Sequence, residues 1–208
     1  LDQISDYAKK ALIAGEDKDF YKHGGFNLIS IARALVTRTG GGSTLTQQLV
    51  KNTLLTDEQS YLRKYQELFM AIAVEQNYSK DDILGMYLNS VYFGENAFGI
   101  EEAAKTYFGK LPKDLNVAES SMLVGLLPAP SLYSPVSGDA AEAKRQQKTV
   151  LKRMANEGYI TKDQQKQAEE QQLAYADNKS QKTNSTAPHF TEMVIKELIN
   201  KYGGEKKG

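Results

Sequence analysis

The stretch GGGSTLTQQLVKN, residues 40–52, predicts how this chain folds. Its glycines form a loop that can turn freely, and Thr44 with Gln47 three positions later makes a capping box, which opens an α-helix. The first N–H groups of such a helix lack partners within it, and with the helix dipole they attract an anion such as phosphate. The stretch therefore predicts a helix with a phosphate site at its start. The alternative is a glycine turn before a solvated helix.

Polar residues continue along the predicted helix. Gln47 and Lys51 are four residues apart, as are Gln48 and Asn52. Residues four apart lie on one helix face, so two adjacent polar rows run along it with a cation at one end.

Outward from this stretch the chain keeps a helical pattern. Apolar residues recur at helical spacing and strand-like alternation is scarce, which predicts a mostly α protein. Capping pairs that begin at Ser79, Asn116 and Thr161 predict the starts of further helices. The polar sequence after Leu173, AYADNKSQKTNSTAP, is typical of a linker, and an amphipathic helix follows it. We expect one domain over residues 1–172, and over 173–208 a linker and helix leading into a longer protein.

Composition limits the possible functions. Lys+Arg 26 balance Asp+Glu 26, so the net charge of +0 argues against a nucleic-acid partner, which usually requires a basic excess. The absence of cysteine excludes disulfides and thiolate chemistry. No apolar run reaches the roughly 18 residues of a membrane-spanning helix, and the first residues do not resemble a signal peptide.

A second polar motif, YLRKYQELFMAIAVEQ, places a carboxylate at the edge of an apolar helix. Glu67 directly precedes the apolar run 68–74, so we expect its carboxylate to be partly desolvated, with Arg63 and Lys64 nearby to keep it charged. The alternative is a helical salt bridge at the rim of the core.

A third motif, GEDKDFYKHGG, residues 15–25, sets an acidic pair against aromatic residues. Glu16 or Asp17 could lie against Phe20 and have its pKa adjusted for general acid or base catalysis. The alternative is an acidic surface turn, with His23 as a structural hydrogen-bonding residue.

Taken in order, EDKDFYKHGG, GGSTLTQQLVKN, RKYQE and KDDILGMYLN resemble the signature motifs of the peptidoglycan glycosyltransferases, the polymerase module of class A penicillin-binding proteins and of monofunctional wall transglycosylases. The likeness runs from about residue 8 to about residue 172. It implies a lysozyme-like α fold with a large lobe and a smaller, membrane-facing jaw. The implied activity is inverting polymerisation of lipid II into β-1,4-linked glycan strands, with release of undecaprenyl diphosphate.

The resemblance also implies partners and a location. The partners are lipid II, the growing lipid-linked strand, the membrane surface and, in the full-length protein, a transpeptidase domain; the location is the extracytoplasmic face of the bacterial cell membrane. It implies sensitivity to moenomycin and no obligatory cofactor, and it allows a divalent cation, Mg or Mn, at Glu67.

Residue roles follow from the same resemblance. Glu16 is implied to be the general base that takes the proton of the acceptor 4-hydroxyl, with a pKa near or modestly above its ordinary value. Glu67 is implied to be the second carboxylate, which orders the groups around the donor diphosphate. The implied substrate-binding residues are Asp17, His23, Arg33, Ser43, Thr44, Gln47, Gln48, Lys51, Asn52, Arg63 and Lys64.

The chain also departs from the family pattern. Gln59 stands where the family usually has a basic residue, the segment between Arg33 and Ser43 is shorter than in many relatives, and Arg145 lies one position further from Val150. Two rival functions remain at this point, a lysozyme-like glycan hydrolase and an inactive scaffold that binds lipid-linked sugars. Apolar residues over 27–39 predict a helix that touches the membrane.

Overall fold

The computed structural model describes residues 1–27, 42–54 and 61–176, and within these ranges it contains helices and no strand longer than a single β-bridge. The mostly α prediction is confirmed. The elements are α1 (Asp6–Glu16), η1 (Phe20–Lys22), α3 (Leu45–Leu54), α4 (Tyr61–Asn77), α5 (Lys80–Ser90), α6 (Gly99–Phe108), η2 (Pro112–Asp114), α7 (Val117–Leu126), α8 (Ala140–Asn156) and α9 (Lys162–Glu170).

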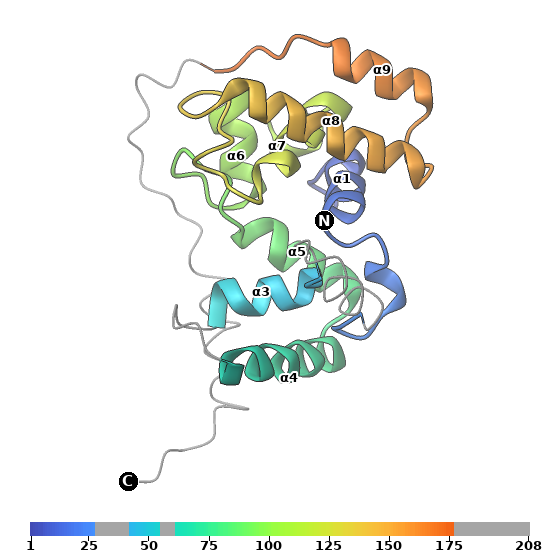
Figure 1. Cartoon of the computed structure of the whole chain (residues 1–208), viewed down its shortest axis with the longest axis vertical. Coiled ribbons are helices and arrows are strands. Elements are labelled where there is room, and N and C mark those ends of the chain that lie inside the picture. The colour runs from blue at the N-terminus through green and yellow to red at the C-terminus, as the bar shows by residue number, and fades with distance from the viewer. Residues whose placement is uncertain (28–41, 55–60, 177–208) are drawn as a thin grey trace, which may run out of the picture.

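These helices form a larger and a smaller group. Helices α1, α6, α7, α8 and α9 gather at one end of the molecule, α3 and α4 pack on each other at the other end, and α5 lies between them (Figure 1). The arrangement agrees with the expected lysozyme-like lobe and smaller subdomain.

Helix α7 is the centre of the larger group and is buried on every side from Ala118 to Leu126. It packs on α1 and on α8, and glycines allow both approaches to be close. A Cβ at Gly125 would lie 3.0 Å from the backbone nitrogen of Gln147 in α8, and a Cβ at Gly15 would lie 2.8 Å from Val124. The last turn of α1 is therefore seated directly on the core.

The predicted helix starts are confirmed. Ser79, Asn116 and Thr161 each accept a hydrogen bond from the N–H three residues later, and the side chain at that later position closes the capping box on α5, α7 and α9.

A polar cluster joins α3, α4 and α5. The Thr46 hydroxyl on α3 donates to Glu75 Oε1 on α4 at 2.5 Å, and Lys80 Nζ on α5 lies 2.7 Å from the same oxygen. Lys80 also lies 4.4 Å from the centroid of the Phe20 ring. The cluster fixes the start of α3 against the turn that follows α1.

The chain after α9 packs on α6. Leu173 and Tyr175 pack against the core, the Tyr175 ring stacks on Phe108 at 5.8 Å between centroids, and the Ala176 N–H donates to the Tyr107 carbonyl at 2.9 Å. Residues 173–176 thus still contact the domain, and the division at 172/173 stays a prediction.

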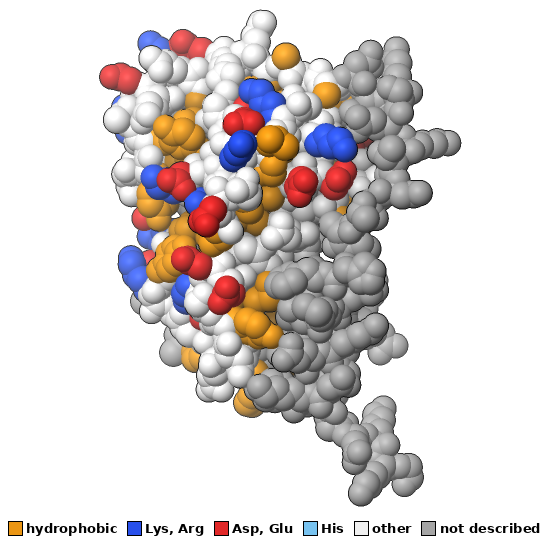
Figure 2. Space-filling view, turned by 180° about the vertical axis from the view of Figure 1, so that it is seen from behind, with side chains coloured by type: hydrophobic (Ala, Val, Ile, Leu, Met, Phe, Trp, Pro, Cys, Tyr) orange, Lys and Arg blue, Asp and Glu red, His pale blue; other side chains and the backbone are white. Residues whose placement is uncertain are grey.

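Several predictions lie outside the described residues. They concern Arg33, Gln59, the short segment before Ser43, the membrane-touching stripe over 27–39, and nearly all of the expected linker and final helix. Among the helices that are described, none is both long and apolar enough to cross a membrane. Figure 2 shows acidic and basic side chains interspersed over the described surface on that side of the molecule.

Candidate active site

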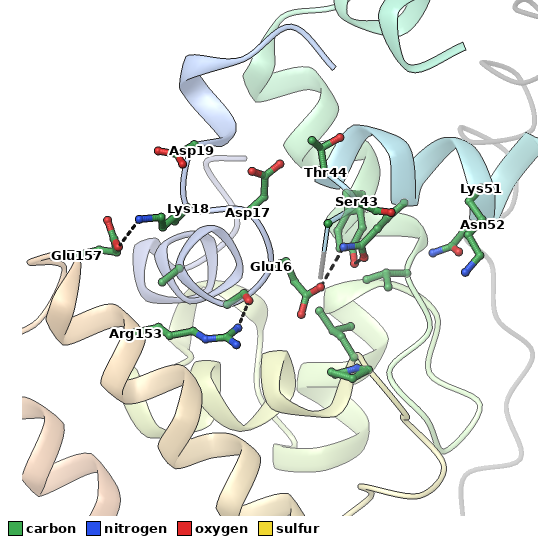
Figure 3. Close-up of a pocket in the computed structure, with 18 of the residues that line it drawn as sticks. Glu16, Asp17, Lys18, Asp19, Ser43, Thr44, Lys51, Asn52, Arg153 and Glu157 are labelled. Carbon is green, nitrogen blue, oxygen red and sulfur yellow. Dashed lines mark hydrogen bonds and ion pairs between the residues drawn. The ribbon is translucent and has the colours of Figure 1, made fainter. Parts of the chain in front are cut away.

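A cleft of about 960 Å³ opens beside the end of α1, where Glu16 is the last helical residue. Figure 3 shows Glu16 in its middle, with Lys18, Arg153 and Glu157 on one side and residues of α3 on the other. The lining residues are Ala14, Gly15, Glu16, Asp17, Lys18, Asp19, Gly42, Ser43, Thr44, Gln48, Lys51, Asn52, Glu67, Tyr87, Val91, Leu127, Pro128, Arg153, Asn156 and Glu157.

The carboxylate of Glu16 is held by one direct hydrogen bond from α3. Gln48 Nε2 donates to Glu16 Oε2 at 3.0 Å. Burial raises the pKa of Glu16, while the Gln48 hydrogen bond and the charge of Arg153 act in the opposite direction. The direction of the shift agrees with the prediction of a pKa at or above the ordinary value. Such a carboxylate is a stronger base than an exposed one once it is ionised.

Arg153 is a cleft residue that the sequence did not single out. Its guanidinium, on α8, donates through Nη1 to the Gly15 carbonyl at the end of α1, 138 residues away in the chain. It therefore fixes the backbone next to Glu16 and brings a positive charge to the carboxylate. No local signal distinguishes it from the other basic residues of α8.

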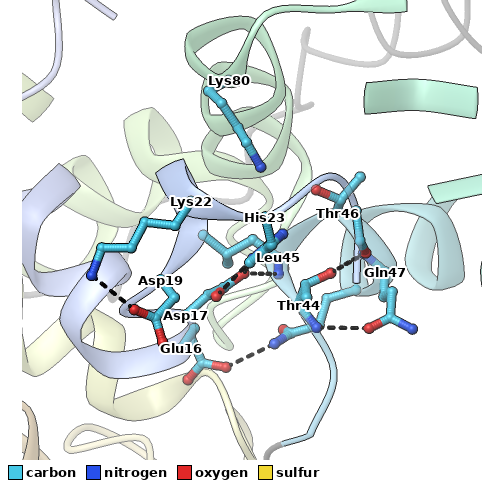
Figure 4. A network of polar contacts seen from close by, with 12 residues as sticks. Glu16, Asp17, Asp19, Lys22, His23, Thr44, Leu45, Thr46, Gln47 and Lys80 are labelled. Atoms are coloured by element: carbon cyan, nitrogen blue, oxygen red, sulfur yellow. Dashed lines mark hydrogen bonds and ion pairs between the residues drawn. The ribbon is translucent and has the colours of Figure 1, made fainter. Parts of the chain in front are cut away.

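Asp17 joins α1 to the start of α3 (Figure 4). Its carboxylate is buried, accepts the Leu45 N–H at 3.0 Å and lies 2.9 Å from His23 Nε2. The His23 side chain is also buried and does not line the cleft. Asp17 and His23, both predicted to bind substrate, are thus engaged with each other, and Asp17 also accepts from the backbone of α3.

The sequence predicted a phosphate site at free backbone N–H groups at the start of α3. This prediction is wrong for the N–H groups of Leu45 and Gln47, because both already have partners within the protein. The Leu45 N–H is taken by the Asp17 carboxylate, and the Gln47 N–H donates to Thr44 Oγ1 at 3.2 Å. The reason is tertiary, because the protein places its own anion at this helix start. An anion in the cleft would be held by side chains instead.

Thr44 and Gln47 form the predicted capping box. The Thr44 N–H donates to Gln47 Oε1 at 2.9 Å, and the Thr44 hydroxyl donates to the Gly25 carbonyl at 2.8 Å. Gln47 is buried and absent from the cleft lining, whereas Thr44 borders it. Gln47 therefore acts on the helix start, away from any ligand in the cleft.

The other side of the cleft carries cations and a buried carboxylate. Lys51 and Asn52 are exposed on α3 and border the cleft. Lys64 on α4 lies 2.5 Å from Glu67 Oε1 and donates to the Ser43 hydroxyl at 3.1 Å. Glu67 is only 3% exposed, whereas the Lys64 side chain is largely exposed, so the pair runs from the buried Glu67 to the surface beside Ser43.

The structure thus brings most of the predicted residues to one place. Those that line the cleft are Glu16, Asp17, Ser43, Thr44, Gln48, Lys51, Asn52 and Glu67. Lys64 contacts two of them, whereas His23, Gln47 and Arg63 are described but do not line it, and Arg33 lies outside the described residues.

A resident metal does not fit the donor set around Glu67. In the part of the chain that the structure describes, no three His, Asp or Glu side chains are grouped to hold an ion. One Glu67 oxygen is already occupied by Lys64. We therefore derive no step through a divalent cation.

Comparison with known proteins identifies relatives over nearly the whole chain. The family model described as Transglycosylase matches residues 1–155. Penicillin-binding protein 1A of Neisseria lactamica is 42% identical in an alignment of 209 positions, which covers 98% of this chain and 26% of that protein. The corresponding protein of Escherichia coli (strain K12) is 41% identical over 98% of this chain and 24% of its own length. The chain spans about a quarter of the length of these relatives.

A solved structure is also similar. The crystal structure of penicillin-binding protein 1A from Haemophilus influenzae aligns with 77% of this chain and 20% of that one, with 27% sequence identity and a TM-score of 0.46.

Proposed function

The chain belongs to the transglycosylase family, and on that premise we propose that it is a peptidoglycan glycosyltransferase. The reaction joins lipid II units into β-1,4-linked glycan strands, inverts the anomeric carbon of the donor and releases undecaprenyl diphosphate. The observation that carries the proposal is the position of Glu16, a partly buried carboxylate in the middle of the cleft, with Lys51 and the Lys64–Glu67 pair on one side of it.

The proposed mechanism uses Glu16 as the general base. The 4-hydroxyl of the acceptor sugar gives its proton to the Glu16 carboxylate while its oxygen attacks the anomeric carbon of the donor. The bond from that carbon to the diphosphate breaks, and the electron pair leaves with the phosphate oxygen. Glu16 then returns its proton to water.

The leaving diphosphate needs positive charge, and side chains of α3 and α4 supply it. Lys51 borders the cleft, and Lys64 is held at its mouth by Glu67 and Ser43. Fixed cations stabilise the negative charge that develops on the diphosphate. Glu67 orders Lys64 and makes no covalent contact with the sugar in this scheme.

The base must be ionised for the reaction to proceed. Because burial raises the pKa of Glu16, the reactive fraction grows as pH rises through that pKa. Gln48 and Arg153 limit the rise and so keep the base ionised closer to neutral pH.

The wider context of the reaction is part of the same proposal. The relatives are much longer than this chain, which covers only about a quarter of their length. We place the domain at residues 1–172 and propose that 173–208 lead towards a transpeptidase domain. The full-length protein would act at the extracytoplasmic face of the cell membrane, where lipid II is found.

The test is incubation with labelled lipid II followed by gel separation of the products. Wild-type protein should give long products that muramidase digests. Glu16→Gln keeps the shape of the side chain and removes the base, so turnover should fall by about 10²- to 10⁴-fold while the protein stays folded. More than about a tenth of wild-type turnover would exclude Glu16 as the base. Short soluble sugars released from a preformed strand would instead indicate a hydrolase.

A further inference from the structure

Three side chains from three helices form a hydrogen-bonded row that ends at the proposed base. The Tyr87 hydroxyl on α5 donates to Gln48 Oε1 on α3 at 2.9 Å. Gln48 Nε2 then donates to Glu16 Oε2 on α1 at 3.0 Å. Tyr87 borders the cleft but is only 1% exposed, so its hydroxyl joins the row from the buried side.

The direction of this row matters because the two ends of an amide have opposite effects on a carboxylate. The amide NH₂ of Gln48 attracts an ionised Glu16, whereas the amide oxygen would repel it. The two ends have nearly the same shape, so packing alone does not select between them. A hydrogen-bond donor beside the amide oxygen favours the orientation in which the NH₂ group of Gln48 faces Glu16.

Tyr87 is such a donor. Burial raises the pKa of its hydroxyl, and the nearby charge of Glu16 raises it further. The hydroxyl therefore stays protonated at neutral pH, and in the structure it donates this proton to Gln48 Oε1. A flipped Gln48 could donate to the Tyr87 oxygen, but its own amide oxygen would then face the ionised Glu16 carboxylate. With Tyr87 donating to Oε1, the NH₂ group faces Glu16 instead, as the structure shows.

We propose that Tyr87 is a positioning residue for catalysis, which acts through Gln48 to orient the Glu16 carboxylate and to favour its ionised form. The inference rests on the proposed role of Glu16 as the base. Tyr87 acts without touching the reacting atoms, since its hydroxyl is engaged with Gln48.

Other charged and titratable groups also face Glu16 and must stay constant in any test. Asp17 follows it in the chain and raises its pKa, while Arg153 on α8 lowers it. The remaining charged groups of the cleft are Lys18, Asp19, Lys51, Glu67 and Glu157. None of these is altered by a substitution at Tyr87 or Gln48.

The experiment titrates Glu16 directly in the 208-residue chain. The side-chain carboxyl carbons of glutamate are labelled with ¹³C and followed by NMR against pH, and Glu16→Gln identifies the Glu16 signal by its loss. The variants are Tyr87→Phe, Gln48→Met and the double substitution. Tyr107→Phe is the matched control, because Tyr107 is fully buried and its hydroxyl donates to the Phe93 carbonyl at 2.9 Å, away from the cleft.

Tyr87→Phe and Gln48→Met should each move the Glu16 midpoint to higher pH, and Tyr107→Phe should leave it in place. If Tyr87 acts through Gln48, the double variant should titrate like Gln48→Met alone. An unchanged midpoint in Tyr87→Phe, or additive shifts in the double variant, would overturn the inference. Should Tyr87→Phe fail to fold, an unchanged midpoint in Gln48→Met overturns it as well.

Turnover of lipid II gives the second readout. On the acid side of the pH profile, Tyr87→Phe should be about three- to tenfold slower than wild type, with kcat reduced more than KM is raised and with the deficit shrinking as pH rises. A merely structural loss would lower the rate equally at all pH values. Wild-type protein that titrates as expected but makes no glycan would count against the proposed function and leave the positioning of Glu16 by Tyr87 standing.

Discussion

Removing Asp17 should loosen the link between α1 and α3. In Asp17→Ala the Leu45 N–H loses its acceptor at the start of α3, which costs about 1 kcal/mol, as for other helix caps. The buried His23 Nε2 loses its partner as well, which costs about 1–3 kcal/mol. The two contributions sum to about 2–4 kcal/mol of unfolding free energy, or about 4–16 °C in Tm for a domain of this size.

Thermal and urea unfolding measure this loss, and Asp139→Ala provides a matched control. The exposed side chain of Asp139 caps α8 by accepting from two backbone N–H groups, and it holds no buried partner comparable to His23, so its removal should cost about 1 kcal/mol. Asp17→Asn, which keeps one acceptor oxygen, should fall between the two. If Asp17→Ala is no less stable than Asp139→Ala, Asp17 does not support α3, and a direct role in substrate binding becomes the better explanation.

Two further predictions concern the charges of the cleft. Lys51→Ala should weaken binding of a diphosphate-linked donor, or of a moenomycin-class phosphoglycolipid, by about tenfold or more, because it deletes a cation beside the proposed leaving group; unchanged affinity in a titration would contradict the assignment of the donor side. Glu16→Gln should raise Tm near neutral pH. The folded-state pKa of Glu16 lies above its unfolded value, so native stability is lost as pH rises through that interval, and the advantage of the variant should vanish below the ordinary glutamate pKa.

Local signals in the sequence predicted the helices well, because a capping box needs only residues three apart. The starts of α5, α7 and α9 followed from Ser79, Asn116 and Thr161 without any tertiary information. The motif residues around Glu16 and Glu67 also came together in one cleft, as their order along the chain indicated.

What the sequence could not predict depends on contacts between distant residues. The N–H of Leu45 was expected to be free, but Asp17 reaches it from 28 residues away. Arg153 meets Gly15 across 138 residues, and Tyr87 is a buried aromatic residue on a helix, a position that is ordinarily core. In each case the partner becomes visible only when the helices are packed.

The return of residues 173–176 to α6 also determines how far a following domain can reach. Because Tyr175 stacks on Phe108 and Ala176 is bonded to Tyr107, the chain stays attached to α6 as far as residue 176, beyond the end of α9. Releasing these four residues would add up to about 14 Å of extended chain. Tyr175→Ala should therefore free these residues without altering the cleft, and in the proposed full-length protein it would extend the reach of the proposed transpeptidase domain.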